Sequence, residues 1–275
     1  MTMTGWRRVS NALPCPICKK TDWCIIATDG TKAICQRVES LKKFGEAGFL
    51  HNIDNSAAKE YAKLPAPQQE RKRTDLAKLA RDYAFRAAAD ERIFKHAAEL
   101  GVSHDSLKQL SVGWDGYAWT FPMVDDMLSV IGIMRRYHDG RKLSVKGGTL
   151  GLFVPTCIDR TKTYVAICEG ATDTAAVLSM GVGNVIGRPN CGSGAGLITK
   201  FIANSNFKNA LLVADNDDAG VGGAKELASH LVSRVNVKIV TPPAGVKDMR
   251  AWLKAGCTLK TLKLMAFVSP WYTKS

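Results

Sequence analysis

Two short apolar runs of the chain end in carboxylates. Glu169 follows the run 164–168, while Asp215 and Asp217 follow the run 211–214. Each run has the length and composition of a buried strand of a parallel sheet, and ligands gather beyond the carboxyl ends of such strands. Asp215 and Asp217 are two residues apart, so in an extended segment their side chains leave on the same side. Clustered carboxylates stay ionised only beside a positive charge, which predicts that these three acids hold Mg²⁺ or Mn²⁺.

The alternative role for these acids is to cap the helices that follow the strands. Asp218, directly before Ala219 and Gly220, is well placed to be such a cap. For any single acid, capping is the commoner role. A Glu and an Asp-x-Asp at the ends of two strands of one sheet favour the metal site.

Four cysteines near the N-terminus form a second candidate site. Cys15 and Cys18 make a Cys-x2-Cys pair, the usual half of a zinc ribbon or knuckle. Asp29-Gly30 lies between two apolar runs and predicts a two-residue hairpin turn. That turn would make Cys24 and Cys35 cross-strand neighbours on one face. The pattern therefore predicts structural Zn²⁺ held by all four thiolates.

Two other arrangements of these cysteines are a set of buried thiols and a Cys24–Cys35 disulfide. The N-terminus lacks the apolar core of a signal peptide, and no apolar stretch approaches the ~20 residues that cross a bilayer. We therefore expect a cytoplasmic protein with no membrane partner, in which cysteines are usually reduced or metal-bound. His51 is a reserve zinc ligand, although its setting is more typical of a surface histidine.

The composition indicates a basic globular protein. The chain has 275 residues, 46% of them hydrophobic, and a formal net charge of +13. Such a charge favours a polyanionic partner, most commonly nucleic acid. Residues 135–146 concentrate five cations on predicted strands and turns, a pattern suited to phosphate groups, although a solvated edge is the alternative. These cations are Arg135, Arg136, Arg141, Lys142 and Lys146.

The chain shows a succession of distinct segments. Asp75 is placed to cap a helix running through Lys95, and Ser103 to cap a second one. From residue 164 to 255, strands alternate with helices, which predicts a parallel sheet with right-handed crossovers. We expect a zinc-binding module (1–52), a linker (53–74), a mixed basic subdomain (75–160), a parallel-sheet domain (161–256) and a C-terminal tail (257–275).

Three motifs of the fourth segment, and one stretch of the third, resemble a known family. Glu169-Gly-Ala-Thr-Asp173, Asp215-Asn-Asp217-Asp-Ala-Gly220 and Lys247-Asp248 resemble the TOPRIM domain of topoisomerases and DnaG-type primases. Phe121-Pro122 and the segment from Ile131 to Gly148 resemble the basic subdomain that precedes TOPRIM in the primases, which topoisomerases lack. The zinc module also resembles that of the primases. The family usually closes its zinc site with a second Cys-x2-Cys, whereas here Val38 stands at the fourth position and Cys24 replaces it.

The resemblance implies an α/β fold in which a TOPRIM parallel sheet, flanked by helices, follows a mixed α+β basic subdomain and a small zinc-ribbon-like β module. It implies a DNA primase of a bacterial cell, phage or plasmid that makes short RNA primers on single-stranded DNA from ribonucleoside triphosphates, with a replicative helicase as candidate partner. Asp173 and Asp248 would join the catalytic acids. Residues that would bind template or triphosphate are Arg135, Arg136, Lys142, Lys146 and Lys247.

Two other functions are compatible with the same residues. One is a TOPRIM-type metal-dependent nuclease, in which the carboxylates would direct water at a phosphodiester. The other is a non-catalytic accessory protein that binds single-stranded DNA. The basic subdomain argues against the nuclease, and the full set of acids argues against the accessory protein.

Overall fold

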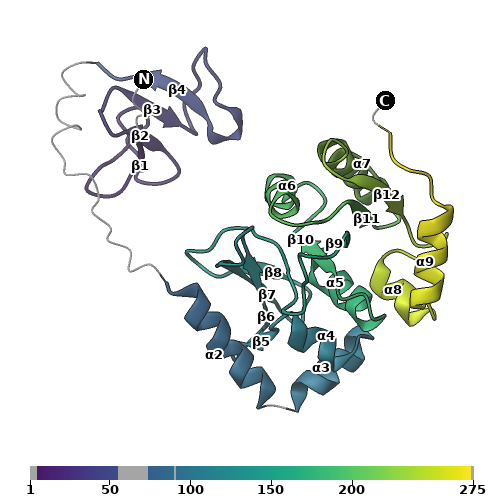
Figure 1. The fold of residues 1–275 in the computed structure, drawn as a ribbon. Coiled ribbons are helices and arrows are strands. Elements are labelled where there is room, and N and C mark those ends of the chain that lie inside the picture. The colour runs from purple at the N-terminus through teal and green to yellow at the C-terminus, as the bar shows by residue number, and fades with distance from the viewer. Residues whose placement is uncertain (1–4, 55–73, 90, 274–275) are drawn as a thin grey trace. The chain divides into compact units, whose positions relative to one another are not determined.

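The computed structural model of the protein describes residues 5–54, 74–89 and 91–273. The chain divides into two compact units, residues 1–72 and 73–275 (Figure 1). The predicted linker of residues 53–74 lies almost entirely outside the described residues. Within the described ranges, no helix has both the length and the apolar character needed to span a membrane.

The first unit is a small antiparallel sheet in the order β1-β2-β3-β4. Ile25 pairs with Ile34 and Ile26 with Ala33, which is the predicted hairpin register. The predicted two-residue turn is wrong, because the connection spans residues 28–31. The carboxylate of Asp29 accepts hydrogen bonds from the backbone and hydroxyl of Thr31 and so widens the turn. The elements are β1 (Trp6–Arg8), β2 (Ile25–Ala27), β3 (Lys32–Cys35), a 3-10 turn η1 (Gly45–Ala47) and β4 (Phe49–Asn52).

The second unit begins with three helices, α2 (Leu76–Ala88), α3 (Arg92–Leu100) and α4 (His104–Gln109). Asp75 and Ser103 cap α2 and α4 through their side-chain oxygens, as predicted. The single helix predicted through Lys95 is wrong, because α2 ends at Ala88. Most of the apolar face of α2 packs in one cluster and that of α3 in another, which Ala87 at the end of α2 also joins.

An antiparallel sheet in the order β5-β6-β7-β8 follows these helices. Helix α2 covers one of its faces, where Tyr83 packs with Ile133 and Val145. The other face carries the aromatic side chain of Phe121, which contacts Phe153 edge to face. The strands are β5 (Gly113–Trp114), β6 (Trp119–Val124), β7 (Val130–Arg136) and β8 (Lys142–Ser144).

The remainder of the chain forms the predicted parallel sheet, in the order β10-β9-β11-β12. Successive residues of β9 alternate between two cores: Val165 and Ile167 face α6 and α7, whereas Ala166 and Cys168 face α5, α8 and α9. Helices therefore cover both faces (Figure 1). The strands are β9 (Tyr164–Glu169), β10 (Val185–Arg188), β11 (Asn209–Val213) and β12 (Asn236–Val240). The helices are α5 (Gly170–Ser179), α6 (Ala195–Ala203), α7 (Asp218–Leu231), α8 (Met249–Lys254) and α9 (Leu259–Val268).

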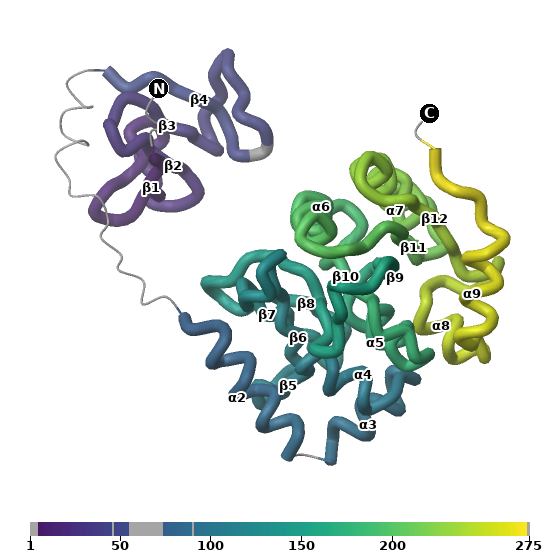
Figure 2. Tube along the Cα trace, viewed as in Figure 1, coloured from purple at the N-terminus to yellow at the C-terminus, as the bar shows by residue number. Residues whose placement is uncertain are grey.

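In the second unit, the antiparallel strands β6 to β8 lie next to β9 and β10 of the parallel sheet (Figure 2). A two-residue segment joins the two sheets. Leu152 exchanges two 2.8 Å backbone hydrogen bonds with Val124 of β6, and Phe153 exchanges two of the same length with Gly187 of β10. Gly187 has no room for a side chain, because a Cβ atom there would collide with the Thr174 hydroxyl. These bonds fix the basic strands beside the carboxyl end of the parallel sheet.

The segment predicted as a C-terminal tail is largely structured. Helix α9 buries Leu262 against the sheet, and Cys257 is buried directly before it. Lys238 of β12 donates hydrogen bonds to the carbonyls of Ala266 and Phe267 at the end of this helix. The tail therefore completes one face of the parallel-sheet domain.

Candidate metal centre and active site

The predicted four-cysteine cluster is present in the first unit. The Sγ atoms of Cys15, Cys18, Cys24 and Cys35 all lie within 4.8 Å of one another. The distances are 3.7 Å from Cys18 to Cys24 and 3.8 Å from Cys24 to Cys35, so no disulfide joins them. Four thiolates around Zn²⁺ at ~2.3 Å would be ~3.8 Å apart. The donor set and its spacing therefore fit a structural zinc ion.

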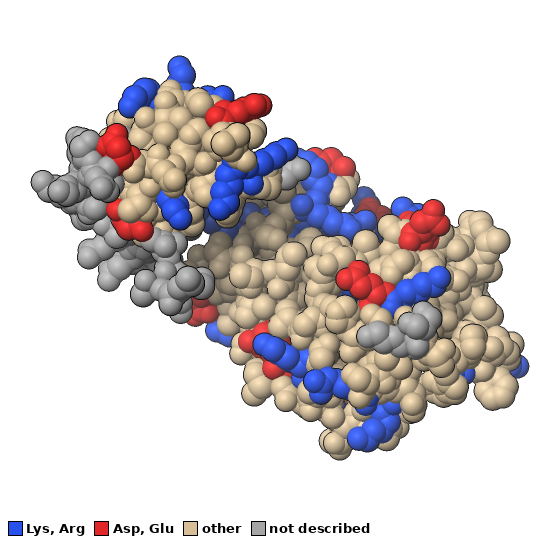
Figure 3. Space-filling model, turned by 90° about the horizontal axis from the view of Figure 1, so that it is seen from above, with Lys and Arg blue, Asp and Glu red and all other residues tan. Residues whose placement is uncertain are grey.

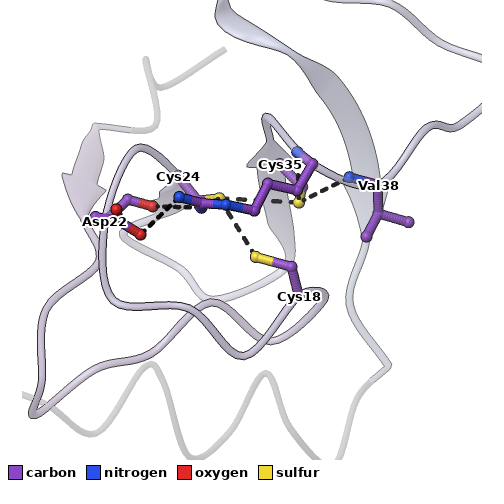
Figure 4. Close-up of polar contacts among 6 residues, drawn as sticks. Cys18, Asp22, Cys24, Cys35 and Val38 are labelled. Atoms are coloured by element: carbon purple, nitrogen blue, oxygen red, sulfur yellow. Dashed lines mark hydrogen bonds and ion pairs between the residues drawn. The ribbon is translucent and has the colours of Figure 1, made fainter.

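Backbone and side-chain donors surround the sulfur atoms (Figure 4). The backbone N–H groups of Arg37 and Val38 both lie 3.4 Å from the Cys35 sulfur. Val38, which occupies the position of the usual fourth ligand, therefore contributes a hydrogen-bond donor instead. Burial raises the pKa of the Cys24 thiol to about 12, so a metal ion is the natural means of keeping that thiolate ionised. His51 lies outside the cluster, with Nε2 3.0 Å from the Val38 carbonyl oxygen.

Four acids line one pocket at the carboxyl edge of the parallel sheet. Glu169 is the last residue of β9, and Asp215 lies just beyond β11, whose Val213 pairs with Cys168. The register therefore brings the two carboxylates to the same edge, as predicted. Asp173 and Asp248 also line this pocket, which has a volume of about 210 Å³.

Asp217 does not line the pocket. It caps α7, and its carboxylate accepts the backbone N–H of Gly220 at 2.8 Å. The cap predicted at Asp218 is therefore one residue too late, because Asp218 is the first helical residue. Among the described residues, the four cysteines are the one group of three or more potential metal ligands whose ligand atoms lie close together. The carboxylates of Glu169, Asp215 and Asp217 are therefore more widely spaced than the four sulfur atoms.

The carboxylates of the pocket perturb one another. Burial and the charges of Glu169, Asp248 and Asp217 raise the pKa of Asp215 to about 6. Burial and the charge of Asp248 raise the pKa of Asp173 to about 7, although the backbone N–H of Arg250 donates to it at 2.9 Å and opposes the shift. A bound cation would relieve this repulsion.

Glu169 offers an oxygen that no described donor satisfies. Its Oε2 atom is buried and has no hydrogen bond within the described structure. Arg188 Nη2 lies 3.5 Å away, an ion-pair contact without hydrogen-bond geometry. A buried carboxylate oxygen of this kind suits a hard divalent cation. The residues present therefore fit Mg²⁺ or Mn²⁺.

The strand pleat separates the two neighbouring arginines of β7. Arg136 lines the pocket, where its Nη1 atom lies 3.5 Å from the Thr172 hydroxyl. Arg135 points to the opposite face and pairs with Asp115 at 2.6 Å, so it does not line the pocket. Lys142 is the register partner of Arg136 and lines the same pocket, whereas the exposed Lys146 does not.

The sequence interpretation missed two arginines. Arg250, in the first turn of α8, lines the pocket together with the predicted Lys247. Arg188 ends β10 beside Glu169 and is 5% exposed. The sequence could have predicted the position of Arg188, because a cation at the carboxyl end of a predicted strand lies at the same edge of the sheet as the acids. Arg250 carried no comparable signal, since a lone arginine in a helix is usually a surface residue.

A larger cavity of about 380 Å³ lies at the amino ends of the parallel strands. Tyr164 and Asn209, the first residues of β9 and β11, line it together with Leu262 of α9. Its lining contains no carboxylate. In parallel sheets ligands bind at the carboxyl ends, so the smaller acidic pocket is the candidate active site.

The chain that carries this acidic pocket is basic as a whole, with a formal net charge of +13. Figure 3 shows more lysine and arginine than aspartate and glutamate side chains on the visible face. An acidic pocket within a basic protein suits a polyanionic substrate that reacts at a metal ion.

No family model matches the chain, and no curated protein sequence matches it either. Solved structures do match it. The DnaG primase catalytic domain bound to single-stranded DNA is 13% identical, with a TM-score of 0.58 over 71% of this chain and 78% of that one. The zinc-binding and RNA polymerase domains of the Aquifex aeolicus primase are 17% identical, with a TM-score of 0.59 over 94% of this chain and 78% of that one. The primase fragment of the bacteriophage T7 primase-helicase protein is 16% identical, with a TM-score of 0.51 over 95% of this chain and 99% of that one. The chain thus has the fold of DnaG-type primases, and its four-cysteine module precedes the unit that resembles their catalytic domain.

Proposed function

We propose that this protein is a DNA primase, which makes short RNA primers on single-stranded DNA by metal-dependent nucleotidyl transfer. The observation that carries this proposal is the acidic pocket itself. Acids of the parallel sheet and cations of the neighbouring antiparallel sheet line one pocket, on a fold shared with DnaG-type primases. Nucleotidyl transfer needs both charges, since the acids bind metal and the cations bind the triphosphate.

The carboxylates would hold the catalytic metal. Glu169 and Asp215 are the principal candidates, because both lie at the carboxyl edge of the sheet and one presents an unsatisfied oxygen. Asp217 lies outside the pocket lining, and one of its oxygens caps α7, but its charge acts on Asp215, so its other oxygen would be an outlying ligand. Asp173 and Asp248 would orient the site through the N-terminus of α8, because both carboxylates accept hydrogen bonds from backbone N–H groups there. The chemistry that Mg²⁺ or Mn²⁺ supplies in such a site is stabilisation of the charge that develops on the transferred phosphoryl group.

The cations would position the nucleotide. Arg136, Lys142, Lys247 and Arg250 line the same pocket and would neutralise the triphosphate of the incoming ribonucleotide. In the reaction, the 3′-oxygen of one nucleotide bonds to the α-phosphorus of the next as the bond to pyrophosphate breaks. Of the predicted basic residues, Arg135 would act only indirectly, by holding β7 through Asp115.

The two remaining features concern partners. The zinc module would grip the template, and the DnaG catalytic domain that shares this fold was solved bound to single-stranded DNA. The T7 fragment belongs to a primase-helicase protein, so a replicative helicase is a candidate partner of this chain. Template binding and priming together imply action in the bacterial cytoplasm, on chromosomal, phage or plasmid DNA.

The test is primer synthesis on varied single-stranded templates with labelled ribonucleotides and Mg²⁺ or Mn²⁺. Wild-type protein should give short, template-dependent products. Asp215→Ala should abolish them, while Asp218→Ala should not, because the exposed Asp218 does not line the pocket. A folded and active Asp215→Ala protein would overturn the metal assignment. Template loss without nucleotides would indicate a nuclease, and neither product nor loss would indicate an accessory DNA-binding protein.

A further inference from the structure

Trp23 has an unusual conformation in the zinc module. It lies between Asp22 and the zinc-ligating candidate Cys24, with a backbone φ of 64°. Its side chain is 69% exposed, the highest value among the tryptophans of the described chain. Among the described residues, none makes an aromatic or hydrogen-bonding contact with its ring. Within the described part of the module, the ring therefore makes neither an aromatic contact nor a hydrogen bond.

Both features of Trp23 are unfavourable for folding alone. A left-handed backbone disfavours residues with a Cβ atom, so glycine or asparagine would suit this position better. An exposed indole also forgoes the burial that normally stabilises a large apolar side chain. Strained residues that gain no packing are characteristic of functional sites.

The neighbouring contacts hold the tryptophan in place. Arg37 donates to the Asp22 carbonyl at 3.0 Å and to the Asp22 carboxylate at 2.8 Å, and its Nη1 atom lies 3.9 Å from the Cys24 sulfur (Figure 4). The Cys24 N–H also donates to the Asp22 carbonyl at 2.8 Å. The guanidinium of Arg37 thus contacts the residues on both sides of Trp23, Asp22 and Cys24. The ring is displayed from a rigid loop, which lowers the conformational entropy lost when a ligand stacks on it.

The charges near Trp23 indicate the class of ligand. The loop between Cys18 and Cys24 also carries Lys19 and Lys20, both exposed. Exposed aromatic rings beside cations are the elements with which proteins bind unpaired nucleic acid strands, since bases stack on the rings and phosphates pair with the cations. We propose that Trp23 is a stacking platform for an unpaired base of single-stranded nucleic acid. This inference rests on the proposed function and assigns the template contact of the zinc module to one residue.

One aromatic pair of the module includes Trp6, on the face of the small sheet opposite to the cysteines. Trp6 pairs with Ala27, whose side chain points away from the face that carries Cys24 and Cys35. Its ring lies 6.4 Å from that of Phe44, so these two rings pack on each other. Each of these rings already has an aromatic partner, whereas no aromatic ring of the described chain contacts Trp23. Phe44 therefore provides a control for an exposed aromatic residue in the same module.

The test is binding of the full chain to fluorescein-labelled oligothymidine, measured by anisotropy in buffer without Mg²⁺. Trp23→Gly suits the backbone and removes the ring, and we expect it to weaken binding about 5-fold or more. Trp23→Phe should retain most of the affinity, and Phe44→Ala should bind like the wild type. Wild-type protein should bind a strand with abasic sites as weakly as Trp23→Gly binds the intact strand. The affinity of Trp23→Gly should fall little further when the intact strand is replaced by the abasic one. Zinc content of each variant confirms that the module is folded.

Three outcomes would overturn the assignment. Trp23→Gly could bind with wild-type affinity, the abasic strand could weaken binding equally for the wild type and Trp23→Gly, or Phe44→Ala could lose as much affinity as Trp23→Gly. Primer synthesis by the wild type, measured in parallel, separates this inference from the proposed function. Wild-type protein that makes no primers but binds through Trp23 would refute the function and keep the stacking site. Primer synthesis with undiminished binding by Trp23→Gly would refute the stacking site alone.

Discussion

The guanidinium of Arg188 lies 3.5 Å from the carboxylate of Glu169, its register partner on the neighbouring parallel strand. The same side chain donates to the carbonyl oxygens of Cys191, at 2.6 Å, and Gly223, at 3.1 Å. One buried cation therefore holds a candidate metal ligand, the loop after β10 and the first half of α7. Its loss should affect both stability and the position of Glu169.

A double-mutant cycle between these residues tests this linkage. We expect Arg188→Met to lower the free energy of unfolding by about 3 kcal/mol, because it leaves a buried carboxylate and two carbonyls without their partner. The added change Glu169→Gln should recover part of the loss, giving a coupling of about 0.5–3 kcal/mol in urea denaturation. The exposed Lys78–Asp82 pair is the matched control, with an expected coupling below about 0.5 kcal/mol. Strictly additive losses would show that Arg188 does not stabilise Glu169.

The cysteine cluster predicts the metal content of the protein. Purified protein should contain about one zinc ion per chain by atomic emission. Cys24→Ser should lose most of it and unfold the first unit, since so small a module derives much of its folding free energy from the metal. Cys157→Ser should keep its zinc, because Cys157 lies outside the cluster. Full zinc occupancy in Cys24→Ser would show that this thiolate is not a ligand.

His96 makes stability depend on pH. Its ring is buried and stacks on Trp119 at 4.3 Å, and burial lowers its pKa to about 4, although Glu99 partly opposes the shift. The other charged groups that act on it, Arg136 and His138, disfavour its protonation further. Between pH 6.5 and 4 the unfolded chain binds a proton that the folded chain excludes, so stability falls as the pH is lowered through this range.

We expect His96 to contribute a loss of at most about 3 kcal/mol in the free energy of unfolding between pH 6.5 and 4. His96→Phe keeps an aromatic ring against Trp119 and removes the titration. Denaturant unfolding of both proteins at several pH values isolates the contribution of His96 to the pH dependence, because both proteins have the same carboxylates. The wild type should lose stability more steeply, and parallel pH profiles would contradict the assignment.

Two lysines of one segment should differ in their effect on activity. Lys142 lines the pocket beside Arg136, whereas Lys146, four residues later, is exposed and does not. Lys142→Gln should lower kcat/KM for ribonucleotide incorporation about 10-fold or more, as expected for loss of a charged contact to phosphate. Lys146→Gln should change it less than about 3-fold, the effect of a distant surface charge. Equal losses in both variants would mean that Lys146 also reaches the substrate.

The sequence alone was sufficient for the strands and helices of the parallel sheet and for the cysteine site, but not for the break between α2 and α3. Strands and helices of the parallel sheet followed from apolar runs and their caps, because hydrophobic periodicity and capping act over a few residues. Cys24 and Cys35 were paired correctly from the position of Asp29-Gly30, since a hairpin turn fixes the register of both strands. The strand-end rule also placed Glu169 and Asp215 at one edge.

Tertiary structure decided which charged residues meet. Arg135 and Arg136 are adjacent in sequence, yet only Arg136 reaches the pocket, because the pleat sends neighbouring side chains to opposite faces and α2 covers one of them. Asp217 turned out to cap α7, since the helix begins at the next residue, Asp218. Arg250 enters the pocket from a helix far along the chain, and such long-range proximity depends on the packing of whole elements. Local patterns therefore specified the elements of the parallel sheet, whereas the composition of the pocket required the fold.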